Sequence, residues 1–271
     1  MNNYIFLNKY SITEKELSDI NNFLIKCSET DKYLYDFQYE EELLNIPSFY
    51  FCYENNIIIG ILSVCLDELD TLCIYSIVSP KYRKKHIFSS LFKMLSDNIK
   101  SFNHTYKYLD FHLSDNNSDF FIPAKNFLTE NNFMFSHKEY LLSFSLSDNL
   151  DKKIVLKKIP SNKSDLELLF DNSSNEFTLW IDENYIGECM IYFPEESAKS
   201  YATIYDYEIQ EVYRGMGYGK FGLYLILKEL QNMQLQKAIL HVSGLNKKAH
   251  SLYISCGFQI NSSITVFTKE I

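Results

Sequence analysis

The sequence predicts an α/β fold built from two similar halves in tandem. Segments with the alternating pattern of strands and segments with the apolar spacing of amphipathic helices follow one another along the chain, and the same order then occurs a second time. The chain has 271 residues, of which 46% are hydrophobic, and this is enough for two packed cores. The polar stretch 147–151 has the composition of a linker. We therefore expect one domain at residues 1–147 and a second at residues 151–271.

The expected elements repeat in kind from one half to the other. Helix caps of Ser and Thr, apolar residues at helical spacing, and β-branched or aromatic runs between turn residues mark their ends. In the first half they are helix 11–27, strands 49–53, 57–66 and 72–78, helix 86–99, strand 106–113, a helix around 125–130, and strand 140–146. In the second half they are strand 154–159, a short helix 164–170, strands 177–181, 185–193 and 201–209, helix 220–233, strand 238–242, helix 247–255, and strand 260–268.

Short motifs also occur twice, in the same order and at the same places relative to the expected elements. The pairs are 54–60 with 182–187, 78–83 with 209–214, and 132–133 with 257–258. We interpret this as an internal duplication.

Composition narrows the class of protein. The formal net charge of −9 argues against nucleic acid or an anionic membrane as the main partner. The six cysteines form no C-x-x-C pair and no spacing typical of zinc, so we expect no metal site and a reducing, cytoplasmic location. We find no signal peptide and no apolar run of membrane-spanning length.

The segment 205–220 is the most informative part of the chain. A β-branched and aromatic strand leads into a turn with Gly215, Gly217 and Gly219, and an apolar helix follows. Four of the eight glycines of the chain lie between Gly215 and Gly222, which disfavours an ordinary flexible connection. Several backbone N–H groups and the positive end of a helix then meet at one place, which predicts a site for an anion such as a pyrophosphate.

A dinucleotide-binding site is an alternative, because 217–222 also matches G-x-G-x-x-G between a strand and a helix. Such a site needs an acidic residue after the next strand, to hold the ribose. The next expected strand, 238–242, is followed by Ser243 and Gly244 instead. We therefore disfavour this alternative.

The pattern Arg214-x-x-Gly217-x-Gly219 resembles the main motif of the GCN5-related N-acetyltransferase (GNAT) family. The resemblance implies two GNAT-like domains, each with a mixed, mostly antiparallel twisted sheet flanked by helices. It also implies that acetyl-coenzyme A is the cosubstrate, with its pyrophosphate held by the loop that begins at Arg214 and its pantetheine arm paired with backbone at Tyr207 and Ile209. The loop residues implied are Gly215, Met216, Gly217, Tyr218, Gly219 and Lys220.

The segment 246–258 matches a second motif of the same family, N-x-x-A-x-x-L-Y-x-x-x-G-F. The resemblance implies that Asn246 contacts the pantetheine and that Tyr253 donates a proton to the departing thiolate, a role that suits a neutral phenol. Taken alone, Tyr253 could equally be a core aromatic on a helical stripe. The general base stays open among Asp206, Glu208, Glu188 and water. The expected reaction is acetyl transfer to a primary amine by direct attack in a ternary complex.

The first half keeps the packing positions of both motifs and loses the chemical ones. His86 and Phe88 stand at the places of two glycines, Phe121 replaces the asparagine, and Leu128 replaces the tyrosine. Side chains in the loop would crowd a pyrophosphate, so we expect a degenerate domain whose amide cradle is lost. Lys84 and Lys85 leave weak binding of coenzyme A there open.

Several points are not decided by the sequence. The acceptor is an amine on a small molecule or a peptide, and the chain is a monomer or a homodimer. A non-catalytic protein that binds coenzyme A or has a regulatory role is the alternative function.

Overall fold

The computed structural model describes residues 4–31, 35, 45–68, 70–101, 106–115, 118–147, 150, 154, 166–194 and 200–271. The chain divides into two compact units. Unit 1 comprises Met1–Leu113, Ile122–Ser136 and Val266–Ile271, and unit 2 comprises Ser114–Phe121 and His137–Thr265. Relative to a division at 147–151, residues 114–121 and 137–147 thus fall in unit 2, and the last six residues fall in unit 1. Among the described helices, none combines the length and apolar character needed to span a membrane.

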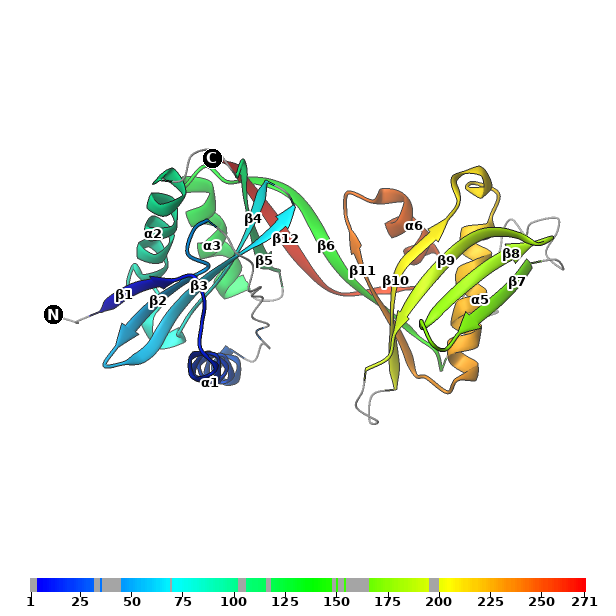
Figure 1. The fold of residues 1–271 in the computed structure, drawn as a ribbon, viewed down its shortest axis with the longest axis horizontal. Coiled ribbons are helices and arrows are strands. Elements are labelled where there is room, and N and C mark those ends of the chain that lie inside the picture. The colour runs from blue at the N-terminus through cyan, green and yellow to red at the C-terminus, as the bar shows by residue number, and fades with distance from the viewer. Residues whose placement is uncertain are drawn as a thin grey trace. The chain divides into compact units, whose positions relative to one another are not determined.

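The first half of the chain contains six strands and three helices among its described residues. They are β1 (Ile5–Lys9), α1 (Glu14–Asp31), β2 (Phe49–Glu54), β3 (Ile57–Glu68), β4 (Thr71–Val78), α2 (Ile87–Ser101), β5 (Tyr108–Ser114), α3 (Ser118–Glu130) and β6 (Met134–Ser145). Strands β1 to β4 pair antiparallel, and β4 pairs parallel with β5. Helices α1 and α2 lie on opposite faces of this sheet (Figure 1).

The second half has the same plan with fewer helices among its described residues. They are β7 (Leu166–Asp171), β8 (Glu176–Ile181), β9 (Asn184–Tyr192), β10 (Tyr201–Ile209), α5 (Tyr218–Asn232), β11 (Lys237–Ser243), α6 (Lys247–Ser255) and β12 (Gln259–Glu270). Strands β7 to β10 pair antiparallel, and β10 pairs parallel with β11. Each half is therefore a mixed, mostly antiparallel sheet flanked by helices, as the sequence predicts.

The last strand of each half enters the sheet of the other. In unit 2, residues 139–145 of β6 pair antiparallel with β11, and the strand order is β6-β11-β10-β9-β8-β7. In unit 1, the order is β1-β2-β3-β4-β5-β12. Apolar alternation predicts that a segment is a strand but not which strand it pairs with, so this exchange was not expected.

The expected helix at 164–170 is wrong. Residues Leu166–Asp171 form strand β7 instead, with partly buried residues alternating with exposed ones. This two-residue period is the signature of a strand at the edge of a sheet, and Glu167, Leu169 and Asp171 are its exposed members. The expected strand at 154–159 lies outside the described residues, apart from Ile154. Strand β1 was not expected, and the other elements occur close to their expected places.

The core of unit 2 lies between its sheet and two helices on one face. Leu223, Ile226, Leu227 and Leu230 of α5 and Tyr253 and Cys256 of α6 pack in one buried cluster with residues of β6 and β8 to β11. The opposite face of β8 to β10 carries no helix among the described residues. Its counterpart in unit 1 is covered by α1, which buries four residues against β2, β3 and β4: Ile20, Phe23, Leu24 and Cys27.

Candidate active site

Strand β10 opens away from β11 in its second half. The parallel pairing of the two strands ends at Ile204 with Leu240. On the other side of β10, the register with β9 shifts between Tyr205 and Glu208, and Asp206 within this bulge has φ of 50°. A bulge bends its strand and increases the twist. The β11 side of residues 205–209 is therefore left as a strand edge with which an extended ligand can pair.

The glycine turn follows the open strand directly. A single 3₁₀ turn at Glu211–Tyr213 leads to Arg214, and Gly215 and Gly217 then have φ of 78° and 97°. Both values lie in the left-handed region that glycine adopts at little cost. Gly217 is the N-cap of α5 and has no side chain to accept from the first turn. The free N–H groups of that turn and the helix dipole can therefore meet an anion, and a Cβ built at Gly215 meets no atom within 4 Å.

Gly219 differs from the other two glycines of the turn. Its backbone is not left-handed, and an added Cβ would lie 3.7 Å from Leu252 Cδ2 and 3.8 Å from Ile209 Cγ1. These are ordinary van der Waals distances. Protein packing alone therefore does not require a glycine at this position.

Arg214 joins the strand exit to the turn. Its Nε donates to the carbonyl oxygen of Ile209 at 2.6 Å, and its Nη2 donates to Glu208 Oε1 at 2.5 Å. Both charged side chains are more than half exposed, so the ion pair itself contributes little stability. The two hydrogen bonds of Arg214 instead fix the direction in which the chain leaves β10. The guanidinium is thus directed at β10 and not at the space in front of the turn.

Helix α6 carries the residues of the second motif. Asn246 is its N-cap, and Asn246 Oδ1 accepts from the N–H of Ala249 at 3.0 Å. Lys220, in the first turn of α5, donates from Nζ to the carbonyl oxygen of Ser255 at 2.8 Å. The N-terminal turn of α5 is thereby fastened to α6, where Tyr253 lies.

Tyr253 is 7% exposed, and its ring centroid lies 5.7 Å from that of Phe258. Burial raises the pKa of its hydroxyl to about 12, with smaller contributions from Cys189 and Cys256. Among the described residues, the hydroxyl has no hydrogen-bond partner. It is therefore a neutral donor that still holds its proton far above neutral pH.

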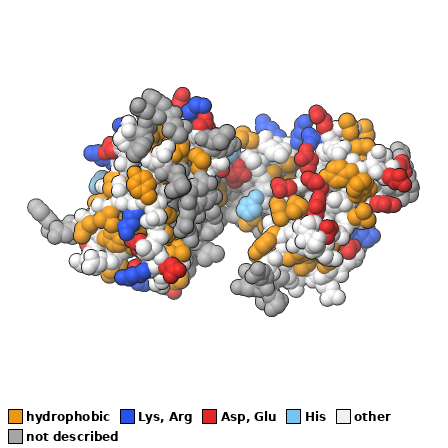
Figure 2. All heavy atoms as spheres, in the orientation of Figure 1, with side chains coloured by type: hydrophobic (Ala, Val, Ile, Leu, Met, Phe, Trp, Pro, Cys, Tyr) orange, Lys and Arg blue, Asp and Glu red, His pale blue; other side chains and the backbone are white. Residues whose placement is uncertain are grey.

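Carboxylates lie on the helix-free face of the sheet in unit 2. Glu188 of β9 is directly opposite Glu208 of β10, and Thr178 of β8 is directly opposite Glu188. Glu188 also accepts a hydrogen bond from the Tyr185 hydroxyl. Figure 2 shows acidic side chains over β9 and β10 on the face of unit 2 turned to the viewer. Asp206, in the bulge, is exposed and makes no hydrogen bond or ion pair to a described residue.

Unit 1 keeps the backbone of the turn. Lys84 and His86, at the positions of Gly215 and Gly217, have φ of 60° and 61°, although such residues seldom adopt this region. Arg83 Nε donates to the carbonyl oxygen of Val78 at 3.1 Å, just as Arg214 does to Ile209. The left-handed turn therefore survives the loss of its glycines.

In unit 1, a phenylalanine packed against other aromatic rings stands at the position of the third glycine of the turn. Phe88 stands at the position of Gly219, and its ring centroid lies 5.7 Å from that of Phe111 and 4.8 Å from that of Phe127. Leu128, at the position of Tyr253, is buried. Unit 1 thus has apolar side chains at two positions where unit 2 has a glycine and a phenol.

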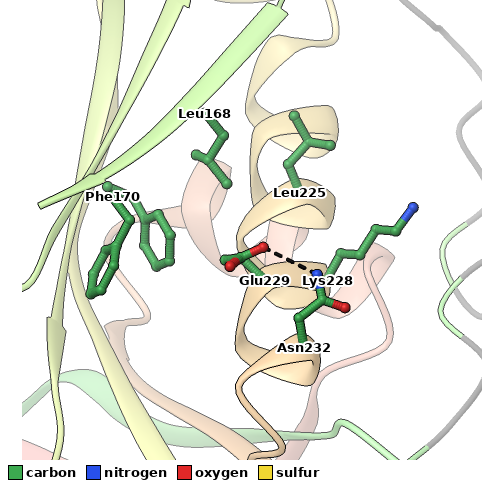
Figure 3. Close-up of a pocket in the computed structure, with 7 residues that line it drawn as sticks. Leu168, Phe170, Leu225, Lys228, Glu229 and Asn232 are labelled. Atoms are coloured by element: carbon green, nitrogen blue, oxygen red, sulfur yellow. Dashed lines mark hydrogen bonds between the residues drawn. The ribbon is translucent and has the colours of Figure 1, made fainter. Parts of the chain in front are cut away.

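A separate hollow of about 420 Å³ lies between the edge of the sheet and the C-terminal turns of α5 (Figure 3). It is lined by apolar residues, among them Leu168, Phe170 and Leu225, and by the polar residues Lys228, Glu229 and Asn232. It is at the opposite end of α5 from Gly217, and α5 is about 20 Å long. It is therefore not part of the site at the glycine turn.

Comparison with known proteins agrees with this geometry. The sequence profile of the acetyltransferase (GNAT) family matches residues 144–258. The second half of the chain is thus similar in sequence to this family. The matched range holds the bulged strand, the glycine turn and the whole of α6. An uncharacterized N-acetyltransferase of Bacillus subtilis, YycN, is 35% identical over 78 residues, which are 29% of this chain and half the length of that relative.

Solved structures extend the likeness of fold to the whole chain. A GCN5-related N-acetyltransferase from Sphaerobacter thermophilus aligns over 98% of this chain and 95% of its own, with a TM-score of 0.72 and 12% identity. A tandem GNAT protein from the clavulanic acid biosynthesis pathway aligns over 98% of both chains, with a TM-score of 0.65 and 12% identity. The chain accordingly has a tandem GNAT fold, in which the GNAT domain recognised by sequence is the second.

Two features of the site were missed at the level of sequence. The bulge at Asp206 interrupts an otherwise regular alternation, and no residue type in 201–209 marks it. The ion pair between Glu208 and Arg214 spans six residues across a strand exit, a spacing that no helix or strand period predicts.

Proposed function

We propose that unit 2 binds acetyl-coenzyme A and transfers the acetyl group to a primary amine by direct attack. One observation carries the proposal: an unpaired strand edge, an uncapped glycine turn and a buried neutral phenol follow one another along β10, α5 and α6. A thioester cosubstrate with a pyrophosphate and an amide-bearing arm matches these three features in turn.

The cofactor contacts that we propose follow the backbone. The N–H groups of residues 215–220 hold the pyrophosphate, supported by the open space in front of Gly215. The pantetheine arm pairs with the backbone of residues 207–209, where β10 has no strand partner on its β11 side among the described residues. Asn246 contacts the arm with its amide nitrogen, since its side-chain oxygen caps α6. Arg214 contributes by holding the strand exit.

Tyr253 is the proposed general acid. The amine nitrogen attacks the thioester carbonyl carbon, a C–N bond forms, and the C–S bond breaks. The Tyr253 proton goes to the departing thiolate, and the proton lost by the amine goes to a base and then to solvent. Burial of the phenol supports this role because it raises the pKa of Tyr253. The hydroxyl is therefore protonated and neutral at every physiological pH.

The helix-free sheet face supports an amine as acceptor. In unit 1, Phe51, Ile61 and Ile77 lie in a row across β2, β3 and β4 and are buried under α1. The corresponding row in unit 2 is Thr178, Glu188 and Glu208. Apolar contacts with a helix are thus replaced by carboxylates, which favour a cationic ligand.

A fungal protein of similar fold is described as acting on an amine, glucosamine. The glucosamine N-acetyltransferase region of a fungal β-N-acetylglucosaminidase aligns over 99% of this chain and 38% of its own, with a TM-score of 0.71 and 11% identity. Which amine this chain takes is not fixed by that likeness.

Asp206 is the proposed base. Glu208 is engaged by Arg214, and Glu188 by Tyr185, whereas Asp206 has neither an ion pair nor a hydrogen bond to a described residue. It also lies at the bulge, beside the open strand edge. If Asp206→Asn leaves the acidic limb of the pH–rate profile in place, the base is Glu188, Glu208 or water instead.

Release of free thiol from acetyl-coenzyme A across a panel of amines tests the function. We expect release with at least one amine and a large loss in Tyr253→Phe. Tight binding of coenzyme A without release on any amine would favour the non-catalytic alternative. A cytoplasmic location and a monomeric or homodimeric state stay predictions from the sequence.

A further inference from the structure

The side chain of Tyr207 points away from the open strand edge and into the helix that carries the glycine turn. Its hydroxyl donates to the carbonyl oxygen of Gly219 at 2.6 Å, and the backbone N–H of Leu223, one helical turn further on, also interacts with this hydroxyl. A partly buried side chain from β10 is thus inserted at the first turn of α5. In general, a side chain that inserts into the hydrogen-bond ladder of a helix bends the helix at that point.

Gly222 provides the room for this insertion. A Cβ built on Gly222 would lie 2.7 Å from the Tyr207 hydroxyl oxygen and 2.8 Å from Leu179 Cδ1. Real Cβ atoms do not approach other atoms this closely, so the helix residue facing Tyr207 has to be a glycine or the hydroxyl has to move. Contacts within the protein, with Tyr207 and Leu179, therefore account for the fourth glycine of the cluster without a ligand.

Unit 1 reverses the sizes of the two residues. Counting from Val78 and Ile209, which stand at the same place in the two halves, Ser76 corresponds to Tyr207 and Leu91 to Gly222. Leu91 is fully buried, and Ser76 Oγ donates to the carbonyl oxygen of Ile61 at 2.9 Å, on the neighbouring strand. A small strand residue with a large helix residue thus replaces a large strand residue with a glycine. Among the described residues, a hydrogen bond from this strand position to the helix backbone occurs in unit 2 and not in unit 1.

The two elements joined by Tyr207 are those to which we assign the two ends of the cosubstrate. Tyr207 follows the bulge at Asp206 directly, so it lies on the part of β10 that is proposed to pair with the pantetheine. Gly219 lies in the turn that is proposed to hold the pyrophosphate. Loss of the hydroxyl would leave the Gly219 carbonyl oxygen without that donor and would free the first turn of α5 from the bulged strand.

We propose that Tyr207 is a positioning residue, whose hydroxyl sets the glycine turn of α5 relative to the open edge of β10 and so fixes the site for coenzyme A. The inference rests on the proposed function, since it presupposes that unit 2 binds coenzyme A. It differs from a role for the Tyr207 backbone alone, because backbone pairing with the pantetheine survives removal of the hydroxyl.

Binding and kinetics of Tyr207→Phe test the inference, with Tyr201→Phe as the matched control. Tyr201 lies at the other end of β10, and its hydroxyl makes no hydrogen bond to a described residue. We expect the Kd of coenzyme A, measured by titration calorimetry, to rise about tenfold in Tyr207→Phe and to stay unchanged in Tyr201→Phe. The KM for acetyl-coenzyme A should rise in parallel, while the KM for the amine should not change, a split that general destabilisation would not produce.

A double variant tests the insertion itself. Gly222→Ala alone should weaken binding of coenzyme A, and the same change in the Tyr207→Phe background should weaken it less, because the hydroxyl that the new Cβ meets is gone. Equal affinity of wild type and Tyr207→Phe, or equal effects of Gly222→Ala in both backgrounds, overturns the inference. If the wild-type protein itself does not bind coenzyme A, the proposed function fails first and the inference falls with it.

Discussion

Glu188 and Glu208 lie directly opposite each other on the neighbouring strands β9 and β10. Like charges at this distance destabilise a sheet, and the corresponding pair in unit 1 is Ile61 with Ile77, buried under α1. This row of the sheet is thus core in one half of the chain and acidic surface in the other. A charged row that costs stability is explained if it meets a cationic acceptor.

Neutralising this pair should affect the acceptor and not the cosubstrate. In Glu188→Gln and Glu208→Gln we expect the KM for a diamine to rise about two- to fivefold, in the range of exposed charge pairs. The Kd of coenzyme A should stay unchanged in Glu188→Gln, which leaves the ion pair between Glu208 and Arg214 in place. Glu229→Gln, on α5 at the opposite face of the sheet, is the control. An unchanged KM for every amine in both variants would remove this face from the acceptor site.

Tyr253→Phe should lower kcat about 100-fold, which is the usual contribution of a general acid, while the Kd of coenzyme A stays the same. An acid must hold its proton to act, so activity is lost as pH rises through its pKa. Because the pKa of Tyr253 is raised to about 12, its ionisation should cause no fall in rate below about pH 10. A basic limb near neutral pH that disappears in Tyr253→Phe would contradict the raised pKa.

Gly217 and Gly219 should respond differently to alanine. The backbone of Gly217 has φ of 97°, in the left-handed region. A residue with a Cβ adopts this region at a cost of about 1 to 2 kcal/mol. At Gly219 the added Cβ makes only ordinary contacts within the protein. We expect Gly217→Ala to lower both the thermal stability of the protein and its affinity for coenzyme A. In Gly219→Ala the thermal stability should not change. Thermal unfolding with and without coenzyme A separates the two effects.

Each chain should bind one molecule of coenzyme A. The turn of unit 1 has the left-handed backbone of its counterpart, but Phe88 packs between Phe111 and Phe127 where unit 2 has Gly219. We expect that an aromatic side chain at this position of the turn crowds out the pyrophosphate. Titration calorimetry should give a stoichiometry close to one, and Gly217→Asp should abolish it. A second equivalent that persists in Gly217→Asp would place a further site in unit 1.

Most elements and the family of the second half could be predicted because both depend on local patterns. The glycines at 215, 217 and 219 and the segment 246–258 are contiguous in sequence, so their chemistry can be recognised without a structure. The helix predicted at 164–170 is wrong, since the two-residue alternation of the edge strand β7 extends over only six residues. The exchange of β6 and β12 could not be predicted, since a strand pattern specifies a face and not a partner.

The directions of side chains on β10 could not be predicted from the sequence either. A regular alternation cannot show that the bulge at Asp206 shifts the register, and it is this shift that accompanies the placement of Tyr207 under α5. The clustering of four glycines in the sequence does not separate their roles. In the structure they serve different ends: Gly215 and Gly217 allow the left-handed turn, and Gly222 makes room for a tyrosine.

Transfer of an isotopically labelled acetyl group tests the central claim most directly. Purified protein is incubated with labelled acetyl-coenzyme A and a panel of mono-, di- and polyamines, amino sugars and peptides, and the products are identified by mass spectrometry. We predict a labelled N-acetyl product with at least one amine for the wild-type protein and none for Gly217→Asp. Absence of any labelled product, with coenzyme A bound and the protein folded, would contradict an acetyltransferase and leave a protein that only binds the cosubstrate.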